Sequence, residues 1–252
     1  MKFLSSVSPH HILAAIAVPL VALLLTIPAN AMSVSPLVLD LSTSGGKNSS
    51  QIAVVNEADK PLPVEIVVLR LELDEKGEMA TKPAGEDFLV LPQQVLIPPG
   101  ATQSFRLQWV GDPHIKTSQS YVVSVNQVPV KMPEGKNGVQ VVFNFGTIVN
   151  VAPLAGKAEI NLVKAGIGKD DKGKIRPELT VKNPGNIHAK LTDATIKLTS
   201  GSWSQTLAPE QLRQTVGIGL IQPGKTRHFF LPVDVPDGVT QVTASIDYKP
   251  IK

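Results

Sequence analysis

The sequence of 252 residues contains no cysteine. Without thiols the chain has no disulfide scaffold, and no zinc or iron–sulfur site held by cysteine. Aromatic residues are scarce, at 4%, and charged residues make up 18% with a net charge of +3. This charge balance is too ordinary for a disordered tail or a dedicated nucleic-acid binder. The composition therefore favours a globular protein held together by core packing.

Long helical patterns are also lacking. The 21 prolines and 19 glycines are spread along the chain and interrupt every apolar stripe of helical period. The best helical candidate is the short segment 209–212. Short β-branched runs between turn formers, such as 64–71 and 121–125, are typical of strands. The chain is therefore predicted to be all-β.

The first 31 residues have the features of an export signal. Lys2 precedes an apolar run over residues 12–27, and Ala29-Asn30-Ala31 follows as a small-residue cleavage site. The alternative is a membrane anchor, but the run is short for a hydrocarbon core of ~30 Å and Pro19 interrupts it. We predict a secretory signal peptide over residues 1–31, cleaved after Ala31. No later run is long enough to span a bilayer, so no stable membrane insertion of the mature chain is expected.

The mature chain has the length of two domains at ~100–150 residues each. Candidate strands of the second half lie at 158–163, 178–182, 189–198, 203–207, 215–221, 226–231 and 241–248. About seven short strands per ~100 residues is the pattern of an immunoglobulin-like sandwich. We predict two Ig-like β-sandwich domains, an N-terminal one over 32–153 and a C-terminal one over 157–252.

Segment 138–151 alternates apolar and polar residues over an unusual length. Its odd positions are nearly all apolar and begin with Val139, Val141, Phe143 and Phe145. As one strand at ~3.3 Å per residue it would exceed about 40 Å. The residues leave two interpretations open: a central strand with these side chains in the core, or an edge strand that docks a partner.

No pattern of catalysis or metal binding is present. His114, His188 and His228 are isolated in the sequence, and His10 and His11 fall in the signal. The chain has no H-E-x-x-H motif, no phosphate loop and no G-x-S-x-G elbow. Asp170-Asp171 is interpreted as a solvated hairpin tip. We predict that the protein is not an enzyme and uses no cofactor or metal.

Five blocks of the mature sequence, taken in order, resemble the periplasmic chaperones of chaperone–usher pilus assembly, the PapD-like proteins. The blocks are FLVLP (88–92) with IPPGATQSFRL (97–107), YVVSVNQVP (121–129), GTIVNVAP (146–153), LTVKNPGN (179–186) and IQPG (221–224). Each block alone is a soft motif, and their order and spacing together carry the resemblance.

The resemblance implies a mechanism, donor-strand complementation, in which a chaperone strand completes the sandwich of a pilus subunit. The donor residues would be Val139, Val141, Phe143 and Phe145. The implied partners are pilus or fimbrial subunits and an outer-membrane usher, with no nucleic acid. The implied compartment is the periplasm. A free edge would also invite self-association of the unloaded protein.

One departure from the family concerns the anchor of the subunit carboxylate. In its well-known branch two basic residues hold that carboxylate, one in the first strand and one in the donor strand. This chain has no Lys or Arg between Met32 and Gly46, nor between Gly138 and Leu154. The resemblance is therefore to a divergent branch, and no anchor residue is assigned.

A second hypothesis is a secreted structural or adhesive Ig-like protein, such as a pilus subunit or a binding module. A subunit would carry its alternating segment at the mature N-terminus of a single incomplete sandwich. Here the segment lies between two sets of strands, which favours the chaperone.

Overall fold

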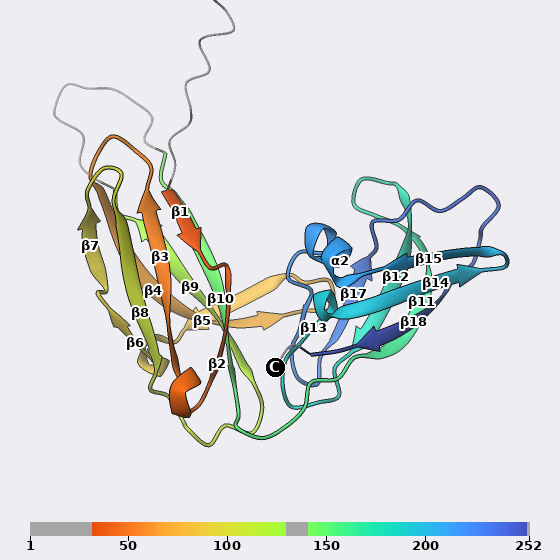
Figure 1. The fold of residues 1–252 in the computed structure, drawn as a ribbon, viewed down its shortest axis with the longest axis horizontal. Coiled ribbons are helices and arrows are strands. Elements are labelled where there is room, and N and C mark those ends of the chain that lie inside the picture. Colours follow the sequence, from red (N-terminus) through yellow and green to blue (C-terminus); the bar gives the residue numbers. More distant parts are fainter. Residues whose placement is uncertain (1–31, 130–140, 251–252) are drawn as a thin grey trace, which may run out of the picture. The chain divides into compact units, whose positions relative to one another are not determined.

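The computed structural model describes residues 32–129 and 141–250 (Figure 1). The described residues from Met32 onward belong to one compact unit. The predicted signal peptide and its cleavage site after Ala31 lie outside the described residues. In the described ranges, no helix is long and apolar enough to cross a membrane.

The fold is all-β, as predicted, and the first Ig-like sandwich is built from two sheets. One sheet has the order β1-β3-β8-β6, and the other has the order β2-β10-β9-β4-β5 with β7 also paired to β4. The strands are β1 (Met32–Ser35), β2 (Val38–Ser42), β3 (Ser49–Asn56), β4 (Leu62–Leu73), β5 (Met79–Pro83), β6 (Phe88–Leu91), β7 (Gln94–Ile97), β8 (Thr102–Trp109), β9 (Gln119–Gln127) and β10 (Asn144–Ala152). Two 3₁₀ turns, η1 (Gly45–Lys47) and η2 (Gly85–Asp87), lie in its loops.

The second sandwich has three small sheets, ordered β11-β12-β17, β13-β16 and β15-β14-β18. Its elements are β11 (Asn161–Lys169), β12 (Ile175–Lys182), β13 (Ala189–Lys190), η3 (Leu191–Asp193), β14 (Ala194–Ser200), β15 (Trp203–Leu207), α2 (Pro209–Thr215), β16 (Leu220–Ile221), β17 (Thr226–Phe230) and β18 (Thr243–Tyr248). The domain boundaries 32–153 and 157–252 stay a prediction.

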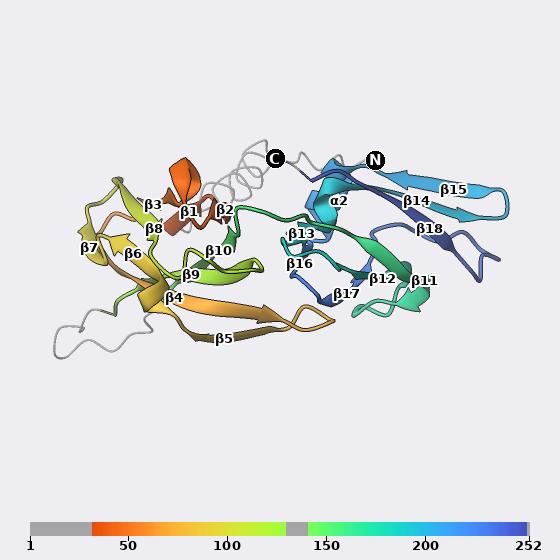
Figure 2. The ribbon, with the colours of Figure 1, turned by 90° about the horizontal axis from the view of Figure 1, so that it is seen from below.

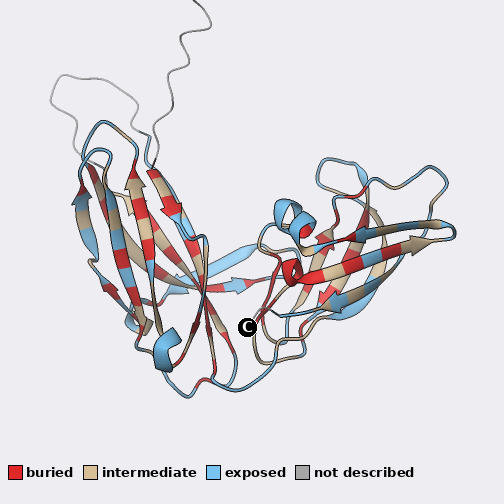
Figure 3. Ribbon diagram, in the orientation of Figure 1, coloured by how far each residue is buried: buried red, intermediate tan, exposed pale blue. Residues whose placement is uncertain are grey.

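Each sandwich has its own apolar core, and buried residues alternate with exposed ones along the strands (Figure 3). The first core gathers Ile52, Phe105, Leu107 and Tyr121, among others. The second is built around Leu179, Leu191, Ile196 and Leu198. Alternation of this kind places one face of every strand in the core, which is why period-two patterns in the sequence predicted the sheets.

Two sequence predictions in the second half have different outcomes. The helical candidate 209–212 is confirmed, because α2 spans Pro209–Thr215 with proline in its first turn. The predicted strand 215–221 is wrong over most of its length, since only Leu220–Ile221 pair as β16. Gly217 and Gly219 have φ of 64° and 62°, so the chain turns there instead of extending.

The predicted long strand 138–151 is shorter in the structure. β10 begins at Asn144, and residues 141–143 precede it without strand pairing, while 138–140 lie outside the described residues. The reason lies in the neighbouring strand, because β9 ends at Gln127, one residue beyond the partner of Asn144. A strand needs a hydrogen-bonded neighbour, and the neighbour ends here.

The long hairpin β4–β5 contacts the second sandwich (Figure 2). The side-chain amide of Gln222 bonds to the hairpin backbone like a neighbouring strand: Nε2 donates to Leu71 O and Oε1 accepts from Leu73 N, both at 2.8 Å. Leu71, Leu73 and Leu220 form a small buried cluster beside these bonds. The hairpin is thereby fixed against β16 and β17.

Candidate functional site

The first half of β10 has one paired edge and one open edge. Gln127 N donates to Phe143 O at 3.0 Å, and Ile148 N donates to Leu37 O at 2.9 Å on the opposite side. Backbone groups of odd residues therefore point to β9, and those of even residues point away from it. The parallel pairing with β2 begins only at Ile148.

Asn144 and Gly146 consequently present their N–H and C=O groups on the open side. Among the described residues, no strand pairs with β10 on that side before Ile148. Both residues are exposed. Unpaired N–H and C=O groups along an edge form a template for an added strand. The edge of β10 is therefore able to extend the sheet by one more strand from another chain.

Exposed apolar side chains lie directly before this edge. Val141 is 62% exposed and Phe143 is 38% exposed, and Val142 between them is also exposed. The Phe143 backbone is held at the end of β9, where its N–H donates to Gln127 Oε1 at 3.2 Å. Apolar side chains on an unpaired edge segment mark a site of association in a soluble protein.

The structure brings together three of the four predicted donor residues. Val141 and Phe143 are exposed, whereas Phe145 packs partly against the first core, on the same face of β10 as buried Thr147. Val139 lies outside the described residues. The assignment of all four as a donor strand stays a prediction.

Two exposed residues near this edge, Val142 and Leu37, were not predicted from the sequence. Val142 stands at an even position, outside the alternating odd-numbered series. Leu37 lies where the chain leaves β1 for β2, and only the tertiary contact of its carbonyl with Ile148 N reveals its place beside β10.

A polar cluster lies where β2 and β10 meet, because Asp40 and Asn150 are partners in the parallel register. Asn150 Nδ2 donates to Asp40 Oδ1 at 3.0 Å. From the second sandwich, His188 Nε2 lies 3.0 Å from Asp40 Oδ1, and Lys190 Nζ lies 2.6 Å from Asp40 Oδ2. His188 is buried and its Nδ1 contacts Ser118 Oγ, so the structure gives this histidine a structural role.

No family model matches the chain, and no curated protein matches it. Among solved structures, the class 5 fimbriae chaperone CfaA is 19% identical with a TM-score of 0.54, over 88% of this chain and 94% of that one. A chain of a chaperone–tip adhesin complex of CFA/I fimbriae biogenesis is 18% identical with a TM-score of 0.52 and the same coverage. A chain of the Salmonella enterica SafA pilin–SafB chaperone complex is 14% identical with a TM-score of 0.51, over 87% and 97%.

The chain has the fold of the fimbrial chaperones. At these identities the match is one of fold, and it confirms the two Ig-like sandwiches predicted from the sequence.

In this fold, the meeting point of β2 and β10 carries an acid, Asp40, and an amide, Asn150. Two basic side chains of the second sandwich, His188 and Lys190, contact the carboxylate of Asp40. Burial by itself raises the pKa of Asp40, but hydrogen bonds and charge from His188 and Lys190 outweigh it and hold the pKa well below its ordinary value of 3.8.

We expect Asp40 to contribute to stability at neutral pH and to lose that contribution in acid. Its pKa is lower in the folded than in the unfolded chain, so ionised Asp40 stabilises the fold above pH 3.8 and less so as the pH falls below it. Asp40→Asn should therefore flatten the fall of the free energy of unfolding below about pH 5, measured by urea denaturation at a series of pH values.

Asp193→Asn is the matched control with the opposite sign. Burial raises the pKa of Asp193, so its protonated form is favoured in the fold and opposes acid destabilisation. Its loss should steepen the acid slope. Equal slopes for both variants and the wild type would contradict this account of the cluster.

Proposed function

We propose that the chain is a divergent member of the PapD-like periplasmic chaperones and that it binds, folds and caps pilus subunits by donor-strand complementation. It then delivers them to an outer-membrane usher. The binding mode is β-augmentation, in which main-chain pairing along an edge gives affinity and alternate side chains give specificity. The open edge of β10 at Asn144 and Gly146 is the observation that carries this proposal.

The side chains beside the edge fit the same role. A strand added to β10 continues the sheet. The odd-numbered residues, which face the core of the first sandwich, then also face the core of the partner. Val141 and Phe143 continue this odd-numbered series before β10 begins at Asn144 and are exposed, and Val139 and Phe145 complete the proposed donor strand. Apolar side chains of this size fill the gap left by a missing strand.

The structural neighbours support the identity of the partner. Two are chains of complexes, described as a chaperone with a tip adhesin and as the SafA pilin with the SafB chaperone. The predicted signal peptide supports export to the periplasm. A secreted structural or adhesive protein is less well supported, because the alternating segment 138–151 runs into β10, the last strand of the first sandwich, and does not lie at the predicted mature N-terminus.

Asn144→Pro tests the edge directly. Proline removes the outward N–H of residue 144 and leaves the ladder to β9 intact, because that ladder uses odd residues. The variant should fold and bind a cognate subunit roughly 10- to 100-fold more weakly, through one lost hydrogen bond and the bulk of the ring. The measurement is subunit affinity by surface plasmon resonance.

Two controls frame this test. Asn144→Ala keeps the N–H and should bind as the wild type. Phe145→Pro removes a group that points to β9 and should lower the melting temperature instead. If Asn144→Pro binds the subunit as tightly as Asn144→Ala, the added strand does not use this edge.

A further inference from the structure

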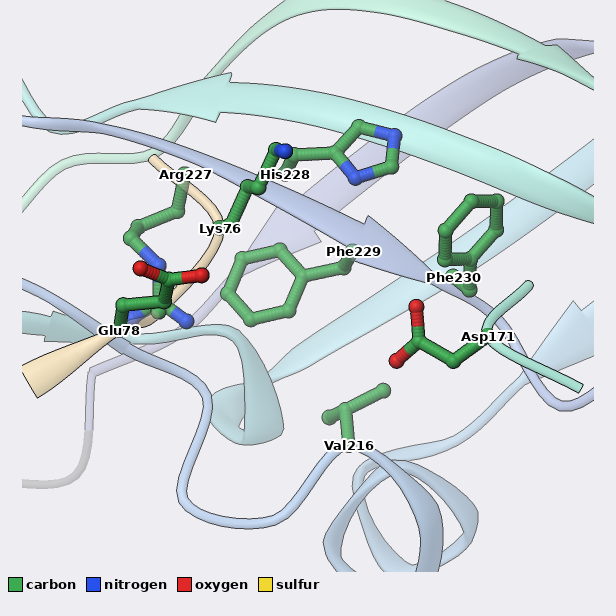
Figure 4. Close-up of a pocket in the computed structure, with 9 residues that line it drawn as sticks. Lys76, Glu78, Asp171, Val216, Arg227, His228, Phe229 and Phe230 are labelled. Atoms are coloured by element: carbon green, nitrogen blue, oxygen red, sulfur yellow. The ribbon is translucent and has the colours of Figure 1, made fainter. Parts of the chain in front are cut away.

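A pocket of about 620 Å³ lies between the turn that joins β4 to β5 and strand β17 of the second sandwich (Figure 4). The hairpin contributes Lys76 and Glu78, and β17 contributes Arg227 and Phe229. Its volume falls within the range of small-molecule sites in proteins, about 300–1,000 Å³. The edge of β10 plays no part in it, so it is separate from the proposed subunit site.

Arg227 is the unusual member of this lining. It is only 8% exposed, and within the described part of the chain its guanidinium makes one hydrogen bond, from Nη1 to Leu220 O at 2.5 Å. Its buried Nε has no hydrogen-bond partner, and among the described residues no carboxylate lies within 4.0 Å of the guanidinium, although the charge of Asp74 acts on it from farther away. Buried cations are normally paired, and a buried donor without an acceptor requires an explanation.

The neighbours of Arg227 keep the guanidinium in this place. Its Cζ lies 4.9 Å from the centre of the Phe229 ring. On the hairpin side it lies against Gly77, where an added Cβ would clash with Nη2. Gly77 has φ of 93°, a conformation that also favours glycine, so the turn lets the guanidinium approach the backbone.

The rest of the pocket combines an apolar floor with balanced charge. Phe229 lies between Arg227 and Asp171, with Val216 below it (Figure 4). Two cations, Lys76 and Arg227, stand against two carboxylates, Glu78 and Asp171, when His228 is neutral. A single negative charge can pair with Arg227, whereas a multiply charged anion meets repulsion from both carboxylates.

We propose that this pocket binds a monocarboxylate with an apolar body. The carboxylate accepts from the end of the Arg227 guanidinium that lines the pocket, and the apolar body lies on Phe229 and Val216. The ligand supplies the negative charge that this buried guanidinium lacks within 4.0 Å. The carboxylate belongs either to a free small molecule or to the terminus of a peptide.

Calorimetry and NMR with N-acetyl-leucine test this proposal. The wild-type protein should bind it with a roughly millimolar dissociation constant, and the amide N-acetyl-leucinamide should bind at least about 10-fold more weakly. Inorganic phosphate should bind more weakly than N-acetyl-leucine. The Arg227 side-chain Nε–H and the Gly77 amide should show the largest chemical-shift changes.

A tetrapeptide ending in leucine, with a free or an amidated terminus, distinguishes the two sources of the carboxylate. If the peptide with the free terminus binds more tightly than N-acetyl-leucine, the ligand is a chain terminus. If it binds more weakly than N-acetyl-leucine, the ligand is a small molecule.

Arg227→Gln should abolish binding, and Arg106→Gln, which changes an exposed arginine of β8, should not. The wild-type experiments decide the proposal even where Arg227→Gln fails to fold. Three results would each overturn the proposal. The acid and the amide could bind equally well, the chemical-shift changes could lie far from Arg227, or folded Arg227→Gln could bind N-acetyl-leucine with the wild-type affinity. None of these outcomes depends on the subunit site.

Discussion

Val141→Asp combined with Phe143→Asp should abolish co-purification of a pilus subunit while leaving the protein folded. Both side chains are exposed before β10 begins, so neither supports a core of the free protein. In the proposed complex both are buried in the groove of the subunit. Burying a valine or phenylalanine side chain contributes about 1.5–3 kcal/mol each.

Losing both contributions weakens binding by roughly 3–6 kcal/mol, which is about 10²- to 10⁴-fold. Two carboxylates brought into an apolar groove add a desolvation cost, so the loss should lie toward the upper end of that range. The measurement is a pull-down of subunit from periplasmic extract, followed by affinity of the purified variant. Thermal unfolding of the variant confirms that the fold is retained.

A matched control is available in the second sandwich. Val163 and Ile175 are 59% and 56% exposed, and neither is near β10 in the sheet order. Val163→Asp with Ile175→Asp makes the same change in charge and also replaces two exposed apolar side chains, away from the proposed site, and should bind as the wild type. If both double variants bind equally well, the donor-strand assignment is wrong; if both fail equally, the loss reflects general charge.

The sheets could be predicted from the sequence because their signal is local. Buried and exposed residues alternate along β8 and β14, and a period of two is readable without knowing which strand pairs with which. The helix α2 was also readable, since Pro209 opens it with a suitable backbone angle. These features depend on neighbours in the chain.

What escaped prediction depends on residues far apart in the sequence. The alternation in 138–151 continues before Asn144, but β9 ends at Gln127, and the sequence does not show where a neighbouring strand stops. The cluster of Asp40 with His188 joins residues 148 positions apart. In the sequence, Arg227 is one charged residue of a predicted strand, and only the fold shows that it is buried.

Asn56→Ala should lower the free energy of unfolding by roughly 3–5 kcal/mol, the largest effect of a single substitution that we expect. Asn56 is buried at the end of β3, and its Nδ2 donates to Lys60 O, Ile97 O and Pro98 O at 2.8–3.1 Å. Its Oδ1 accepts from Ala58 N at 3.1 Å. One side chain thus joins β3 of one sheet to β7 of the other. Alanine leaves the buried Ile97 O without this partner and removes the bonds to three partly buried backbone groups, at about 1–3 kcal/mol for each group that stays unsatisfied.

The second sandwich repeats this arrangement with Asn183. Its Nδ2 donates to Ile187 O and Ile221 O, and its Oδ1 accepts from Gly185 N and Glu159 N. The backbone of each asparagine also pairs with a Pro-Gly turn, since Gly100 N donates to Asn56 O and Gly224 N donates to Asn183 O. Asn183→Ala should therefore have a similar cost. This chain has no disulfides, and these two asparagines connect segments that a disulfide could connect in another protein.

Chemical denaturation with thermal unfolding measures both effects. A loss of this size shifts the melting temperature by about 10 °C in a chain of this length. Asn161→Ala, at an exposed asparagine on β11, is the control and should stay within about 0.5 kcal/mol of the wild type. Asn56→Asp keeps the shape but turns a carboxylate toward three carbonyl oxygens, so at neutral pH it should destabilise at least as much as alanine. A loss below about 1 kcal/mol for Asn56→Ala would mean that water replaces the amide, and that the two sheets are held at this corner by apolar packing alone.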